Sequence, residues 1–183
     1  MNPLPIPVPY LTAALVLMAA FCDLRSREIP NWLTLGGIVS GLAVHSYLTG
    51  WSGLQFSAAG LGVAALVFLP LWWMRWLGGG DMKLMAAVGA LTGWSNLIVI
   101  FIFDAMLGGV VALVAVITRG RSRRTLHNIG RMVSAMLHGK APHEVSPELE
   151  AGTEESMGMP RAVTIAIATL LILWTATLPA PTR

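Results

Sequence analysis

Residues 97–117 read Leu-Ile-Val-Ile-Phe-Ile-Phe-Asp-Ala-Met-Leu-Gly-Gly-Val-Val-Ala-Leu-Val-Ala-Val-Ile, an apolar run with one charged side chain, Asp104. A helix needs roughly 20 mostly apolar residues to cross a bilayer, and this run is long enough. Five further runs share its apolar character, and they cover residues 9–22, 32–48, 54–77, 82–92 and 162–178. We therefore expect an all-α, polytopic integral membrane protein with about six transmembrane helices.

The composition supports this class. Of 183 residues, 55% are hydrophobic and 11% are charged, whereas a soluble domain has about 25% charged residues. The length predicts one membrane domain over residues 1–183. The single cysteine, Cys22, cannot form an internal disulfide or a cysteine-based zinc site. The run 82–92 is short for a full span, but the turn-like residues 93–96 would otherwise lie inside one implausibly long helix.

The basic residues predict the orientation. If the six helices alternate in direction, eleven of the twelve Lys and Arg residues lie on one side of the membrane, and only Arg183 lies on the other. Basic residues concentrate in cytoplasmic loops. We therefore expect that side to be cytoplasmic and both termini to be outside.

The longest connection, residues 118–160, divides into two parts. Residues 122–139 place apolar side chains at helical spacing among several arginines, a pattern typical of a basic helix lying on anionic lipid. Residues 141–158 contain five glutamates and no Lys or Arg, which predicts a solvated, flexible segment. We expect the whole connection to be a cytoplasmic loop between the fifth and sixth helices.

Two aspartates are the leading candidates for chemistry. Asp23 follows the first apolar run and Asp81 precedes the fourth, so the expected topology places both at the cytoplasmic membrane boundary. Two carboxylates in a partly dry site cannot easily both ionise, so one holds a proton and the other acts as a base. Such a pair can hydrolyse a peptide bond. Alternatively, Asp81 is the N-cap of the fourth helix, and Asp23 anchors the topology by pairing with Arg25 or Arg27.

The sequences around these aspartates resemble the type IV prepilin peptidases. Those membrane aspartyl proteases have a first Asp shortly before an Ile-Pro-Asn element and a second Asp within Gly-x-Gly-Asp. Here Asp23 precedes Ile-Pro-Asn at residues 29–31, and Gly-Gly-Gly-Asp occupies residues 78–81. A lone Gly-x-Gly-Asp is a weak signal, but both motifs in order are strong. The resemblance covers roughly residues 10 to 175.

The resemblance implies a membrane aspartyl endopeptidase with Asp23 and Asp81 as catalytic residues and no metal or cofactor. Its partners would be prepilin or pseudopilin precursors and membrane lipid, not nucleic acid. Cleavage would remove a short basic leader at the cytoplasmic end of the precursor's hydrophobic segment, in the inner (plasma) membrane. The motifs also imply supporting residues: Gly78, Gly80, Lys83, Pro30 and Asn31. Lys83 could orient Asp81 or meet a lipid phosphate.

Within that family, the size looks like the short, peptidase-only members that serve tight-adherence (Flp) pili. Longer members also methylate the new N-terminus and carry a cytoplasmic segment with paired, zinc-binding cysteines. Residues 159–161, Met-Pro-Arg, look like the family's Ile-Pro-Tyr-Gly element before the last helix, although the glycine is absent. Methylation, oligomeric state and the identity of the pilin stay open.

Other polar residues leave two alternatives. A small proton-coupled carrier could use Asp23, Asp81 and Asp104 as a relay, and a non-catalytic component of a pilus assembly machine would need no dyad. A relay predicts polar residues through the membrane depth, whereas here they concentrate at one face. We expect Asp104 to lie nearer the outer side and to bond another helix. We expect His45 to be an interfacial polar residue.

Overall fold

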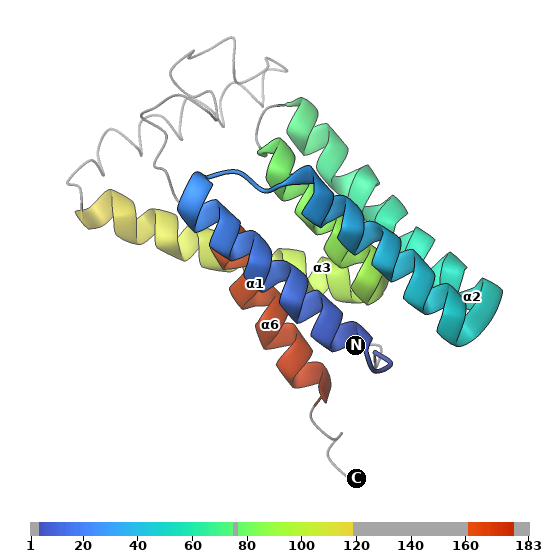
Figure 1. Ribbon diagram of the computed structural model, residues 1–183. Helices are drawn as coiled ribbons and strands as arrows, with labels where there is room; N and C mark the ends of the chain where they lie inside the picture. Colours follow the sequence, from blue (N-terminus) through green and yellow to red (C-terminus); the bar gives the residue numbers. More distant parts are fainter. Residues whose placement is uncertain (1–3, 75–76, 119–160, 178–183) are drawn as a thin grey trace.

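The computed structural model describes residues 4–74, 77–118 and 161–177 (Figure 1). These ranges contain four helices in chain order, α1 (Val8–Ser26), α2 (Asn31–Trp73), α3 (Gly79–Thr118) and α6 (Arg161–Thr177), and no strand. The all-α expectation is therefore confirmed for the described part of the chain. The expected basic helix and acidic segment lie outside the described residues.

Three of the helices are long and apolar enough to cross a membrane. They are α1, α2 and the Gly79–Val114 part of α3, whereas the apolar helix Arg161–Thr175 is shorter. Large apolar side chains point outward from the bundle, with 90% of Tyr47 and 83% of Trp73 exposed. A protein surrounded by water rarely leaves so much apolar surface uncovered. The helices therefore belong to a membrane protein.

The two longest helices each contain a break at one glycine. Gly50 has φ 62° and ψ −137°, and Gly93 has φ 77° and ψ 166°. Residues with a Cβ rarely adopt such positive φ angles, whereas glycine does so readily. Figure 1 shows that α2 doubles back on itself and that α3 turns sharply. The break expected at residues 93–96 is confirmed, but it is confined to Gly93.

Two helix boundaries differ from the predicted apolar runs. Helix α1 continues past Cys22 to Ser26, where Arg27 closes it with a left-handed φ of 55° and its amide donates to the Asp23 carbonyl oxygen at 2.9 Å. This is a common way for a helix to end. Helix α2 stops at Trp73, before Leu77. The end of an apolar run therefore does not coincide with the end of the helix.

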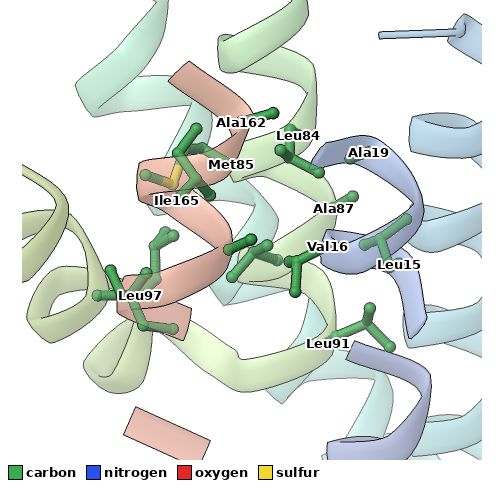
Figure 2. Close-up of a cluster of buried hydrophobic side chains, with 14 of the residues drawn as sticks. Leu15, Val16, Ala19, Leu84, Met85, Ala87, Leu91, Leu97, Ala162 and Ile165 are labelled. Carbon is green, nitrogen blue, oxygen red and sulfur yellow. The ribbon is translucent and has the colours of Figure 1, made fainter. Parts of the chain in front are cut away.

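The first half of α3 lies at the centre of the bundle. Its side chains Leu84 and Leu91 are buried, and Figure 2 shows this half between α1 and α6. Against α2 the backbones approach closely, because a Cβ added to Gly60 would lie 2.0 Å from the carbonyl oxygen of Gly89. Small residues at helix contacts permit such close approach in membrane proteins.

Polar side chains of α2 support the break in α3. The Ser57 hydroxyl donates to the Ala90 carbonyl oxygen at 2.6 Å, and His45 Nε2 donates to that of Leu91 at 2.8 Å. A helix break frees carbonyl groups of the preceding turn, and these need partners where water is absent. His45 is buried, with 3% exposed. The expectation that His45 is interfacial was wrong, because its acceptor exists only through the break at Gly93.

Candidate functional site

Asp23 lies in the last turns of α1 rather than after the helix. Its Oδ2 accepts a hydrogen bond of 2.9 Å from the backbone N–H of Ala162, which lies 139 positions away. Because α6 begins at Arg161, this N–H belongs to the first turn, whose amides lack partners within the helix. The carboxylate therefore bonds to the start of another helix, rather than to Arg25 or Arg27 as the alternative held.

Asp81 is the third residue of α3 and is buried, with 9% exposed. The cap position belongs to Gly78, whose carbonyl oxygen accepts the Met82 N–H at 3.1 Å. The alternative in which Asp81 caps this helix is therefore wrong. A Cβ on Gly78 would lie 3.2 Å from Asp81 Oδ2, so the carboxylate turns back over the glycine turn. A side chain at Gly78 would crowd that carboxylate.

Two contacts bring the motifs of Asp23 and Asp81 together. A Cβ on Gly80 would lie 3.4 Å from Ile29 Cβ, so Ile29 packs directly on the glycine turn. Lys83 Nζ donates to Asn31 Oδ1 at 2.8 Å. Pro30 precedes the first residue of α2 in an extended conformation, with φ −61° and ψ 135°. The side-chain contact that the structure gives Lys83 is therefore with Asn31 rather than with Asp81.

The two aspartates are close enough to interact electrostatically. The charges of Asp23, Asp104 and Arg161 all act on the Asp81 carboxylate. The structure therefore gathers Asp23 and Asp81 at one end of the bundle, although they are far apart in the sequence. Among the described residues, no three His, Cys, Asp or Glu side chains are grouped to hold a metal ion.

Asp104 lies nearer to this site than the sequence predicted. On a straight helix it would lie about 35 Å from Asp81, but the break at Gly93 redirects the second half of α3. The Asp104 carboxylate is near enough to α6 for Thr164 and the charge of Arg161 to act on it, although the Thr164 hydroxyl donates to the Arg161 carbonyl oxygen at 2.9 Å. The expected hydrogen bond from Asp104 to another helix stays a prediction, and the expected separation from Asp81 is wrong.

The residues that sequence reasoning missed lie in the first turn of α6. The Ala162 amide bonds Asp23, the Thr164 side chain lies near Asp104, and the charge of Arg161 acts on Asp81. The start of the apolar run at residue 162 did predict this helix end. The residues alone did not show which carboxylates it would meet, because these contacts join distant parts of the chain.

Comparisons with known proteins agree with the two motifs. The profile of the type IV leader peptidase family matches residues 10–113. A prepilin leader peptidase/N-methyltransferase of Burkholderia pseudomallei (strain K96243) is 37% identical over 123 residues, which cover 62% of this chain and 38% of that protein. The protein of the same name in Escherichia coli (strain K12) is 33% identical over 133 residues, which cover 66% of this chain and 58% of that protein.

A third relative of the same name, from Legionella pneumophila, is 30% identical over 117 residues and is covered over 41% of its length. The chain thus spans less than two thirds of the length of these relatives. No solved structure matches significantly. The matched segment contains Asp23, Asp81 and the break at Gly93, and it ends before α6.

Proposed function

The chain belongs to the type IV leader peptidase family, and from that premise we propose that it is a membrane aspartyl endopeptidase that removes the basic leader from prepilin-like precursors. The observation that carries the proposal is the meeting of Asp23 and Asp81 at one end of the helix bundle. The names of the relatives support the substrate class.

In the proposed reaction, the charged member of the pair takes a proton from a water molecule, which attacks the carbonyl carbon of the scissile peptide bond. The protonated member first hydrogen-bonds the carbonyl oxygen and then supplies a proton to the leaving amine. The Ala162 N–H orients Asp23 through its hydrogen bond. Gly78 leaves the Asp81 carboxylate uncrowded, because a Cβ there would lie 3.2 Å from its Oδ2.

The supporting residues hold the two motifs in position relative to each other. The bond from Lys83 to Asn31 ties the start of α3 to the start of α2. Ile29 and Gly80 make the second contact between the same segments. We propose that these contacts fix the separation of Asp23 and Asp81, and that Pro30 sets the direction in which α2 leaves the site.

We further propose about six membrane crossings, with the site on the cytoplasmic side of the inner membrane and both termini outside. Helix α2 has 43 residues, a length of about 65 Å if straight, and the hydrocarbon core is about 30 Å thick. Its break at Gly50 is therefore suited to two crossings. The break at Gly93 divides α3 similarly, and the one-sided distribution of basic residues supports the orientation.

The test uses the purified full chain in lipid vesicles, with a peptide that contains a basic leader, a glycine and a hydrophobic segment. Asp23→Asn and Asp81→Asn should each abolish cleavage, because an amide is neither acid nor base, while both proteins stay in the membrane. Glu28→Gln, which removes an exposed carboxylate near Asp23, is the matched control and should cleave normally. Near-normal cleavage by either Asn variant would show that Asp23 and Asp81 are not the catalytic pair.

A further inference from the structure

We propose that Trp72 is a substrate-binding residue: its indole N–H donates a hydrogen bond to a backbone carbonyl oxygen of the bound leader, close to the Asp81 carboxylate. The inference rests on the proposed peptidase function and names a contact that the enzyme makes with that substrate. Trp72 lies in the last turn of α2 and belongs to neither of the two motifs that identified the aspartate pair.

Two adjacent glycines before Asp81 lie against two different polar groups. A Cβ on Gly78 would lie 3.2 Å from Asp81 Oδ2. A Cβ on Gly79 would lie 3.3 Å from Trp72 Nε1 and 3.9 Å from Trp72 Cδ1. The edge of the indole that carries the N–H therefore rests on the same glycine turn as the Asp81 carboxylate.

Trp72 and Asp81 are near enough for one short peptide to reach both. Adjacent Cα atoms are 3.80 Å apart and a Cβ lies about 1.5 Å from its Cα, so Trp72 Nε1 and Asp81 Oδ2 are at most about 13 Å apart. An extended chain covers about 3.3 Å per residue. A segment of no more than about four residues therefore spans the distance from the carboxylate to the indole.

The inner face of α2 directs Trp72 toward the site. Phe68, four residues earlier, is 1% exposed and packs edge-on against Phe101, with the ring centroids 5.0 Å apart. Residues four apart lie on the same face of a helix, so Trp72 continues this buried stripe beyond the core. Its side chain is 46% exposed, whereas that of Trp73 is 83% exposed. Trp73 is therefore suited to anchor α2 at the membrane interface, and the covered part of Trp72 lies on the glycine turn.

The indole N–H of Trp72 has no hydrogen-bond partner in the described part of the chain. A tryptophan N–H is a donor only, and the N–H of a covered indole usually has a partner. An extended leader brings backbone carbonyl oxygens into the site, and these need donors where water is partly excluded. Such an oxygen fits this N–H, and the contact recognises the backbone of the leader rather than its side chains.

The first experiment measures kcat and KM for cleavage of the leader peptide by the full chain in vesicles. Trp72→Phe keeps an aromatic ring and removes the N–H, so KM should rise about 2- to 10-fold, as expected for the loss of one hydrogen bond, while kcat stays within about twofold. Trp73→Phe makes the same change one residue further along and should alter neither constant. An unchanged KM in Trp72→Phe, or equal effects of the two variants, would overturn the proposal.

A methyl group on Gly79 tests the same contact from the other side. The indole of Trp72 supplies the only described atoms within 4 Å of a Cβ there, so Gly79→Ala should displace the indole and raise KM by a similar factor. The double variant should bind the peptide no more weakly than the weaker single variant, because one contact is lost only once. Effects that multiply would contradict the contact.

The closing experiment needs no cleavage, so it separates this inference from the proposed function. The full chain with Asp23→Asn, labelled with ¹⁵N at its tryptophan indoles, is placed in lipid nanodiscs and titrated with a dye-labelled leader peptide, whose fluorescence anisotropy reports binding. Trp72→Phe and Trp73→Phe assign the two indole N–H resonances. The Trp72 resonance should shift in proportion to the bound fraction, and the Trp73 resonance should stay in place.

Three outcomes decide between the two proposals. A bound peptide that leaves the Trp72 resonance unmoved would overturn the role of Trp72, even if the wild-type protein cleaves. If the Trp72 resonance shifts but the wild-type protein does not cleave, the peptidase function fails and the contact stands. If no peptide binds to the Asp23→Asn protein, the proposed contact fails as well.

Discussion

The close contact between α2 and α3 at Gly60 predicts a large effect from one methyl group. In Gly60→Ala, the new Cβ would lie 2.0 Å from the Gly89 carbonyl oxygen. Ordinary contact begins at 3.4 Å, so the α2 and α3 backbones must separate by about 1.4 Å, and overpacking of this kind destabilises by about 1–3 kcal/mol. Asp81 lies about two turns from Gly89 on the same half-helix, so the shift should also lower cleavage.

The assay follows helical circular dichroism of the purified protein as the SDS fraction rises, beside the cleavage rate in vesicles. Gly62→Ala is the matched control, because nothing lies within 4 Å of a Cβ at that position two residues along α2. Gly62→Ala should unfold at the wild-type SDS fraction or above it, since alanine favours helix over glycine. Equal stability of the two variants would refute the close packing of α2 on α3.

Three further predictions concern the helix break, the topology and metal. Ser57→Ala should destabilise the folded protein by about 1–3 kcal/mol, because the Ala90 carbonyl oxygen loses its side-chain donor away from water. Ser52→Ala, at an exposed site, should leave the stability unchanged, and unfolding in SDS compares the two variants. A reporter fused after Arg124 should read cytoplasmic and one inserted at Ser52 external, because basic loops stay inside; a reversed result at either position would put the proposed site on the wrong side. A strong chelator should leave cleavage by the purified protein unchanged. If chelation abolished cleavage and one added metal restored it, the two aspartates would be metal ligands and the aspartyl mechanism would be wrong.

Apolar runs and motif order were enough to predict much of this protein. The runs predicted α1 and α6 to within a few residues, and the sequence around Gly93 predicted the break in α3. The two motifs predicted that Asp23 and Asp81 would meet. These features depend on local composition and on residues close together in the chain, so a single sequence carries them.

The direction of the chain after a break was not predictable. A glycine at residue 93 signals that the helix is interrupted. The φ and ψ angles of Gly93 then set the direction of the second half of α3 and therefore the position of Asp104. Counting crossings therefore placed Asp104 nearer the outer side of the membrane, whereas its charge acts on Asp81. His45 was misread for a related reason, because its carbonyl partner, Leu91, lies 46 positions further along the chain, just before the break at Gly93.

The hydrogen bond between Asp23 and Ala162 also decides when, during synthesis of the chain, the site around the two aspartates can be completed. The two residues are 139 positions apart, and at about 5–20 residues per second their emergence from the ribosome is separated by roughly 7 to 28 seconds. Throughout that interval the aspartate pair lacks the amide that orients one member. A nascent chain that has inserted α1, α2 and α3 therefore carries both carboxylates in an unfinished site, and we expect the proposed proteolysis to begin only after α6 has joined the bundle.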